Sequence, residues 1–216
     1  MKQSQITLRG IQTGDAPALE EIIRKTWKYD ALSKNPKDAQ RMSRVFLRGC
    51  LLRATFSCVA EKDGRVLGAI LVNSKNEKRK GALRQNFSFL RAVLSLLLTK
   101  RGRQIGRFFL TFEKIDNELL ENCPAPFDGE ICFFAVDEAA RGTGVGKRLF
   151  SAAMEYLRLQ KAKTFYLFTD TSCTYQFYEK RGMRRLGERL VDFKPHIDYR
   201  LSMFIYGGDL QGEESL

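Results

Sequence analysis

The chain has little of what builds metal centres and disulfide-rich folds. Its 216 residues include one histidine, His196, and five cysteines, none of them in a Cys-x-x-Cys pair. Structural zinc sites need four cysteine or histidine ligands at characteristic spacings, so no zinc site is expected. An odd number of cysteines without such spacing is typical of free thiols in a reducing compartment, and the expected location is therefore the cytoplasm.

Long apolar segments and acidic residues are scarce as well. The longest nearly apolar run lies around Leu94–Leu98 and is too short to cross a bilayer, and the residues after Met1 do not predict a signal peptide. The 37 Lys and Arg residues outnumber the 25 Asp and Glu residues, which gives a net charge of +12. A basic surface attracts anionic small molecules, nucleic acid and anionic lipid alike, so the net charge does not identify which of them the protein binds.

What the chain does contain is typical of one globular domain. Hydrophobic residues make up 44% of the chain and charged residues 29%. A length of 216 residues suffices for one full core with an insertion. We therefore expect a single domain over residues 1–216.

A glycine-rich turn between a strand and a helix is the clearest local pattern. The apolar, β-rich segment Ile131–Val136 predicts a buried strand. Beyond the turn, apolar residues recur at helical spacing: Val145, Leu149, Ala152, Ala153, Tyr156 and Leu157. Unpaired backbone amides and the positive end of the helix dipole meet at such a turn, and glycines let an anion approach the backbone. A phosphate group is therefore the expected ligand.

Two common phosphate-binding patterns do not match this turn. A Walker-type loop needs glycine where Arg141 stands and Ser or Thr where Arg148 stands. A dinucleotide-binding loop that starts at Gly142 needs glycine where Lys147 stands. The pattern that remains is Arg-x-x-Gly-x-Gly over residues 141–146, directly after a strand.

A second pattern follows the helix. The strand-like segment Thr164–Thr169 leads into Tyr175–Met183, which contains Phe-Tyr-Glu-Lys-x-Gly followed by a bulky apolar residue. Both patterns, in this order and at this spacing, resemble the two signature blocks of the GNAT superfamily of N-acetyltransferases over residues 128–190. The resemblance implies an α/β fold of the α+β type, with a mixed, mostly antiparallel central sheet of six to seven strands flanked by helices.

The resemblance also implies the co-substrate. In the family the turn amides hold the pyrophosphate of an acyl-CoA, so acetyl-CoA is expected here, and no metal. The residues implied to bind it are Phe134, Ala135, Val136, Arg141, Gly142, Thr143, Gly144, Val145, Gly146, Lys147, Thr171 and Tyr178. Arg141 either adds charge at the pyrophosphate or braces the turn. Thr171 stands where many family members have an Asn that contacts the pantetheine arm, which is a departure from the family pattern.

Two residues are candidates for proton transfer. Tyr178 stands at the position of the family's general acid, which protonates the CoA thiolate, and the alternative is a core aromatic residue. Glu130 begins the CoA-binding strand at the position of the general base in histone-acetylating members, and the alternative is a solvated carboxylate. Cys132 and Cys173 lie near the inferred site, but free thiols are favoured over a covalent acyl-cysteine route because no His or Asn partner accompanies them. A backbone N–H of the strand 133–136 would hold the oxyanion.

The remaining segments predict the other elements of this fold. Strands are expected at 6–11, 55–61, 66–72, 185–191 and 199–206, and helices from Asp15 and over 37–52. Asp-Gly between two of these strands predicts a hairpin. Residues 75–126 are the main departure from a minimal family member. Helical patterns on either side of the basic run 100–103 predict an αα-hairpin, inserted before the CoA-binding strand.

The first inserted helix is apolar on more than one face, and basic residues flank it at 78–80 and 100–103. Excess apolar surface lines a pocket, meets a partner subunit or touches a lipid surface. We favour a wall of the acceptor pocket, followed by a homodimer contact and then by membrane-surface contact.

The expected function is an acetyl-CoA-dependent N-acetyltransferase that acetylates a primary amine by direct attack in a ternary complex. Two alternatives stay open: a catalytically inactive module that binds CoA or associates with nucleic acid, and a transferase that uses a longer acyl-CoA. No specific nucleic-acid motif is visible. The acceptor, a small-molecule or peptide amine, is not encoded in any motif.

Overall fold

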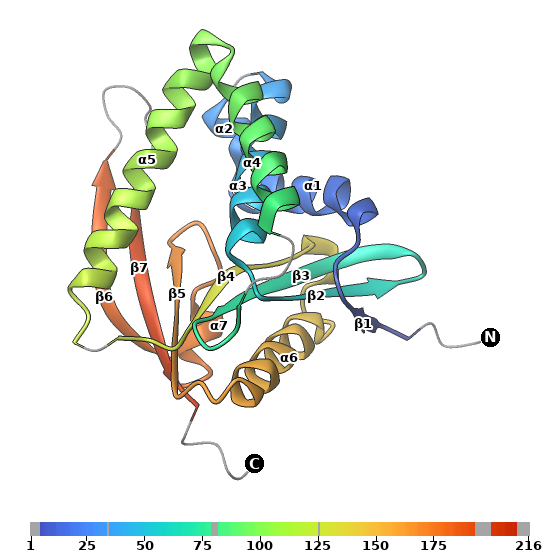
Figure 1. Cartoon of the computed structure of the whole chain (residues 1–216), viewed down its shortest axis with the longest axis vertical. Coiled ribbons are helices and arrows are strands. Elements are labelled where there is room, and N and C mark those ends of the chain that lie inside the picture. Colours follow the sequence, from blue (N-terminus) through green and yellow to red (C-terminus); the bar gives the residue numbers. More distant parts are fainter. Residues whose placement is uncertain (1–4, 34, 79–81, 125, 193–199, 211–216) are drawn as a thin grey trace.

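The computed structural model describes residues 5–33, 35–78, 82–124, 126–192 and 200–210, which form one sheet with helices on both faces (Figure 1). The strands are β1 Thr7–Arg9, β2 Phe56–Lys62, β3 Arg65–Ser74, β4 Gly129–Val136, β5 Thr164–Asp170, β6 Arg184–Asp192 and β7 Arg200–Asp209. The helices are α1 Ala16–Thr26, α2 Tyr29–Leu32, α3 Pro36–Arg53, α4 Ala82–Leu97, α5 Lys100–Glu121, α6 Val145–Leu159 and α7 Gln176–Glu179. The seven strands follow the order β1-β2-β3-β4-β5-β7-β6, which confirms the mixed, mostly antiparallel sheet.

The sheet is divided where β4 meets β5. These two strands run parallel and pair only at Gly129 with Phe165 and at Glu130 with Tyr166. On its other side β4 stays paired with β3 as far as Val136. The divergence therefore opens a V between the strands β1–β4 and the strands β5–β7, and it leaves one edge of β4 without a strand partner. Backbone groups along such an edge are available to a ligand.

Helix α6 covers one face of the sheet. Its apolar stripe is fully buried and consists of Val145, Leu149, Ala153 and Leu157. Strand residues alternate between the two faces, so that Ile70 contacts the α6 cluster while Ala69 and Leu71 contact the cluster of α1 and α3. The positive end of α6 is thus held at the open end of the V.

The opposite face is covered by α1, α3 and the inserted hairpin of α4 and α5. Helix α4 packs closely on α3, since a Cβ atom at Gly49 would lie 3.4 Å from the ring of Phe89. A Cβ at Gly102 would collide with the carbonyl oxygen of Leu96, so the connection between α4 and α5 requires glycine there. Thr99 caps α5 by accepting a hydrogen bond of 2.9 Å from the Gly102 amide.

Helix α5 bridges the two halves of the sheet. It has 22 residues and is about 33 Å long. Near its beginning Ile105 belongs to the cluster of α1 and α3. Near its end Ile115 and Leu119 pack on strands β6 and β7. The insertion therefore crosses the V, as Figure 1 shows for the long helix in front of β6 and β7.

The αα-hairpin is confirmed, and three local expectations were wrong. The break between the two helices lies at Leu98 and Thr99, and the basic run 100–103 forms the first turn of α5. Asp15 precedes α1 without capping it, because its carboxylate accepts hydrogen bonds of 2.7 Å from the Arg9 guanidinium and the Gln12 amide. The first strand is shorter than predicted, and the short helix α2 was not predicted.

Among the described residues, no helix combines the length and apolar character that crossing a membrane requires. Within the same ranges, no three His, Cys, Asp or Glu side chains converge as a metal-binding group. His196 lies outside the described residues.

Candidate active site

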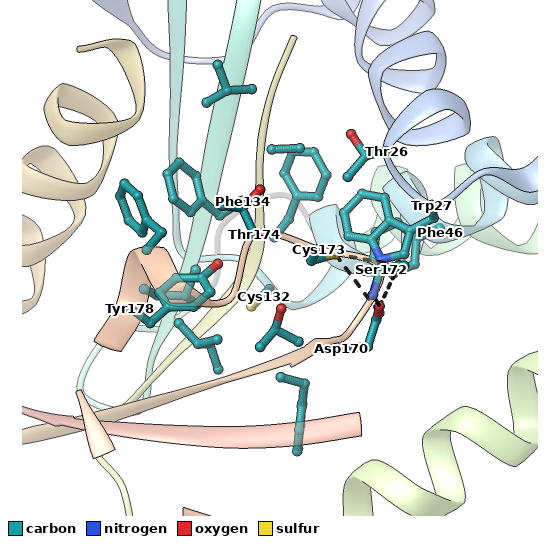
Figure 2. A pocket seen from close by; sticks show the side chains of 18 of the residues that line it. Thr26, Trp27, Phe46, Cys132, Phe134, Asp170, Ser172, Cys173, Thr174 and Tyr178 are labelled. Carbon is teal, nitrogen blue, oxygen red and sulfur yellow. Dashed lines mark hydrogen bonds between the residues drawn. The ribbon is translucent and has the colours of Figure 1, made fainter. Parts of the chain in front are cut away.

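A pocket of about 600 Å³ lies between the diverging strands. Strand β4, the glycine-rich turn, β5 and α7 line it together with α1, α3 and α5. Figure 2 shows Phe134 and Tyr178 toward one end, Trp27 and Phe46 toward the other, and Cys132 between them. Parts of the chain that are far apart in sequence thus share one cavity.

The turn before α6 exposes backbone amides. Gly142 and Gly144 have φ angles of 79° and 84°, and a Cβ atom at either would meet nothing within 4 Å. The first helical bond runs from the Arg148 amide to the Gly144 carbonyl at 3.1 Å. Within the described parts of the chain, no carbonyl or side chain accepts from the amides of residues 145–147. Free amides at the positive end of a helix form an anion site, and glycine keeps the approach open.

The side chains of the turn divide into two groups. Arg141 and Lys147 are exposed and line the pocket. The Arg141 side chain makes no hydrogen bond or ion pair with any described residue, which supports the interpretation that it adds charge rather than braces the turn. Thr143 and Val145 do not line the pocket, because the Thr143 hydroxyl donates to the Ala140 carbonyl at 2.7 Å and Val145 is buried under α6.

The unpaired edge of β4 forms the middle of the pocket, with Phe134, Ala135 and Val136 in its lining. The pairing with β3 skips Cys132, since Leu71 pairs with Phe133 and Val72 pairs with Ile131. This β-bulge breaks the regular alternation, so that Cys132 and Phe133 both contact the cluster of α1 and α3. Bulges are frequent beside active sites because they redirect side chains and backbone groups.

Tyr178 on α7 is both a core residue and a pocket residue. Only 8% of its surface is exposed, and its ring centroid lies 6.4 Å from that of Phe134, 5.5 Å from Phe177 and 6.0 Å from Tyr206. It nevertheless lines the pocket (Figure 2). Burial raises the pKa of Tyr178 far above its usual value. The phenol therefore keeps its proton at physiological pH and can donate a hydrogen bond to an anionic sulfur.

Glu130 lies at the point of the V, where β4 and β5 last pair. It is 6% exposed, lines the pocket, and its Oε1 atom lies 2.9 Å from Nη1 of Arg53 on α3. The alternative of a solvated carboxylate is therefore wrong. The carboxylate is available to the pocket only as half of an ion pair.

Asp116 on α5 is a pocket residue that the sequence analysis missed. Its Oδ1 atom is buried and has no hydrogen-bond partner among the described residues. Burial raises the pKa of Asp116 to about 8, against the opposing effect of Arg53. A sequence signal did exist, since Asp116 follows Phe109 by seven residues and Phe112 by four, which places a carboxylate on an apolar helix face.

Aromatic side chains form the end of the pocket away from the turn. The Trp27 ring centroid lies 5.0 Å from that of Phe46 and 6.1 Å from that of Phe133. Phe109 of α5 meets Tyr29 edge-on at 6.3 Å. Trp27 directly follows α1, and the other rings come from α2, α3, β4 and α5, so no local pattern in the sequence could have grouped them. Aromatic faces beside carboxylates suit a cationic ligand.

The two cysteines of the site are neutral thiols. Burial raises the pKa of Cys173 to about 12 and also raises that of Cys132. A thiol, unlike a thiolate, is a poor nucleophile, which weakens the covalent route. Figure 2 shows Cys173 beside Asp170 and Ser172, where the Ser172 amide donates to Asp170 at 2.7 Å.

Thr171 does not join the site. It is exposed, lies outside the pocket lining, and its hydroxyl accepts a hydrogen bond of 3.2 Å from the Ser202 amide on β7. The expected contact of Thr171 with the pantetheine arm is therefore not supported by its position.

Known proteins share this architecture. Residues 16–183 match the model of the Acetyltransferase (GNAT) family. An N-acetyltransferase from Staphylococcus aureus Mu50 has a TM-score of 0.56 at 16% identity, over 96% of this chain and 100% of that one. The ribosomal-protein-S18-alanine N-acetyltransferase from Escherichia coli has a TM-score of 0.51 at 14% identity, over 98% and 99%. A putative acetyltransferase from Salmonella typhimurium, solved with acetyl-CoA, has a TM-score of 0.53 at 14% identity, over 99% and 98%.

No curated protein sequence matches the chain. At such low identity the solved structures show a shared fold. The family model goes further, because it spans most of the chain and includes both the turn before α6 and α7. The chain belongs to the GNAT family of acetyltransferases.

Proposed function

We propose that the protein is an acetyl-CoA-dependent N-acetyltransferase that acetylates a primary amine by direct attack in a ternary complex. The observation that carries this proposal is the convergence of three features on one pocket. The free amides of residues 145–147, the unpaired edge of β4 and the protonated Tyr178 all border it. Acetyl-CoA bound to the Salmonella typhimurium protein of the same fold supports the choice of co-substrate.

In this reaction the amine attacks the thioester carbonyl, a C–N bond forms and the C–S bond breaks. The turn amides and Arg141 bind the pyrophosphate. Backbone N–H groups on the open edge of β4 stabilise the negative oxygen. Tyr178 donates its phenolic proton to the departing thiolate sulfur and regains a proton from solvent. The proton that the amine loses passes to a carboxylate.

For that carboxylate we propose Asp116 in place of Glu130. The pocket offers the amine a free oxygen at Asp116, whereas Glu130 is already paired with Arg53. A general base works best when its pKa lies near the working pH, and about 8 for Asp116 meets that condition. The role of Glu130 as base stays a prediction, and the two residues can be separated by substitution.

The lining of the pocket also limits which amines fit as acceptors. Trp27, Phe46 and Phe109 line the same pocket as Asp116, so an amine with an apolar or aromatic body fits better than a polyhydroxylated one. We place the reaction in the cytoplasm, to which the five free cysteines are suited.

A thiol-release assay with acetyl-CoA and a panel of amines tests the proposal. We expect turnover to be highest with aromatic or alkyl primary amines and to require Tyr178. Propionyl-CoA and longer acyl-CoA donors, tested beside acetyl-CoA, address the alternative of a longer acyl chain. Tight CoA binding without turnover on any amine would instead favour the inactive CoA-binding module.

A further inference from the structure

Helix α4 presents an apolar face that nothing in the described chain covers. Its inner face is anchored by Ala92 and Leu96, which are 4% and 2% exposed. The outer face carries large apolar side chains at helical spacing: Phe87, Leu90, Leu94, Leu97 and, one residue past the helix, Leu98. Phe87 is 64% exposed and Leu98 is 80% exposed. We call these five residues the outer face of α4.

The charge of this segment of the sequence is of one sign. Residues 78–112 contain nine Lys and Arg residues and no Asp or Glu, so they carry +9 of the net charge of +12, and the rest of the chain is close to neutral. Arg91 lies on the outer face itself, three residues before Leu94. The first turns of α5 add exposed Lys100, Arg101, Arg103 and Arg107. The connection between α4 and α5 lies at the top of Figure 1, beyond the sheet.

We propose that the outer face of α4 docks on an anionic lipid bilayer, with the helix lying in the plane of the interface. A helix with leucine and phenylalanine on one face and only basic charges around it is typical of membrane-surface helices. The apolar side chains enter the boundary of the acyl chains, and the arginines and lysines meet the acidic headgroups. The helix lies on the membrane and does not cross it, in keeping with the described helices.

Two other partners for the outer face of α4, a second copy of the chain and nucleic acid, fit its charge and apolar character less well. A second copy of the chain on the same face would bring two sets of basic residues together without acidic partners, which repel each other. Nucleic acid would pair with the basic residues but would leave Leu94 and Leu98 unburied, because phosphates offer no apolar surface. An anionic bilayer satisfies both features at once.

Docking leaves the pocket open. The outer face contributes no residue to the pocket lining, whereas Phe108, Phe109 and Phe112 of α5 do, so the expectation that the first inserted helix forms a wall of the pocket was wrong. Membrane attachment is therefore separable from catalysis, and it would hold the acceptor pocket near amines that partition into the membrane surface.

Co-sedimentation of the full chain with vesicles tests the proposal. One set contains equal parts of phosphatidylcholine and phosphatidylglycerol, and the other contains phosphatidylcholine alone. We expect binding to the anionic vesicles only, weakened by high salt. Leu94→Glu and Leu98→Glu should each weaken binding by about tenfold, since burying one leucine is worth that factor or more. Leu159 and Leu190 are 73% and 52% exposed on α6 and β6, so Leu159→Glu and Leu190→Glu serve as matched controls.

Three results would overturn the proposal. One is equal binding of both vesicle sets, and another is anionic binding that Leu94→Glu and Leu98→Glu do not weaken. The third is a dimer in sedimentation velocity that these variants dissociate, without any vesicle binding, which would assign the face to a second copy. Unchanged melting temperature and CoA affinity in the variants would establish that the fold is intact.

Discussion

The two sides of the pocket are built in different ways. The side where we propose that acetyl-CoA binds, the donor side, consists of β4, the turn at 141–144, α6 and α7, which follow one another closely in the chain. The groups that it offers to a ligand are mostly backbone amides, and glycines with positive φ angles keep them accessible. The side where we propose that the amine binds, the acceptor side, is assembled from α1, α2, α3 and α5, and the groups that it offers are side chains such as Trp27, Phe109 and Asp116.

Because of this difference, we expect the backbone site to be common to the fold family and the side-chain site to be particular to this chain. A backbone site is encoded by a few glycines and a strand–turn–helix pattern, so it tolerates change elsewhere. A side-chain site on an inserted helix can change with each substitution. We therefore expect the donor side to govern acetyl-CoA binding and the acceptor side to govern the choice of amine.

The largest expected effect is on the donor side, at Gly144. Gly144→Asp places a negative charge against the pyrophosphate and should weaken CoA binding by about a hundredfold or more, measured by calorimetric titration. Gly64 supplies the control, because its φ angle of 73° and the open space around it match those of Gly144. Gly64→Asp carries the same backbone strain in a distant turn and should leave CoA affinity unchanged. Equal CoA affinity in the Gly144→Asp and Gly64→Asp variants would show that the turn does not bind the pyrophosphate.

Removal of the Tyr178 hydroxyl should have the next largest effect. Tyr178→Phe keeps the packed ring and should lower kcat by roughly 10²–10⁴-fold, the range of general acid catalysis, without altering CoA affinity. Tyr175→Phe, on a neighbouring tyrosine outside the pocket lining, is the control. If kcat of Tyr178→Phe is close to the wild-type value, Tyr178 only packs in the core and is not the general acid.

Asp116 and Glu130 can be distinguished by pH. Asp116→Asn should lower kcat/KM by about tenfold to a hundredfold, a modest loss because water can also take the amine proton. The substitution should also remove the rise of kcat/KM with pH that the titration of Asp116 produces near pH 8. If Glu130→Gln removes the acidic limb instead while Asp116→Asn does not, Glu130 is the base.

Asp116 also makes a prediction about stability. Its pKa is higher in the folded protein than in the unfolded chain, so the folded state binds the proton more tightly and loses stability as pH rises from about 4 to about 8. In the wild type we expect the free energy of unfolding to be lower at pH 9 than at pH 4, by a few kcal/mol at most. In Asp116→Asn this contribution to the difference between the two pH values should be absent. Denaturant titrations of both proteins at the two pH values measure it. An identical pH dependence in the two proteins would contradict the burial of Asp116.

The donor side could be predicted from the sequence because it depends on local geometry. Positive φ at Gly142 and Gly144 and the apolar spacing of α6 are properties of adjacent residues. The same locality made the Asp-Gly hairpin and the inserted helices predictable. Thr171 was misassigned because the direction of its side chain depends on a contact with β7, which lies thirty residues further along the chain.

The acceptor side could not be predicted because tertiary packing creates it. Arg53 and Glu130 are 77 residues apart and meet only when α3 crosses the end of β4. Asp116 gains its raised pKa from burial against those same elements. The bulge at Cys132 depends on strand register, which composition does not reveal.

Paired kinetics on Phe109→Ala and Phe112→Ala test the division of the pocket most directly. Both side chains line the pocket from α5, while Leu110 on the same helix is 65% exposed and points away, so Leu110→Ala is the control. We expect the acceptor KM to rise by roughly tenfold in each phenylalanine variant, from the lost aromatic contact, with acetyl-CoA affinity unchanged. Leu110→Ala should change neither value. Weaker acetyl-CoA binding with an unaltered acceptor KM would contradict the assignment of α5 to the acceptor side.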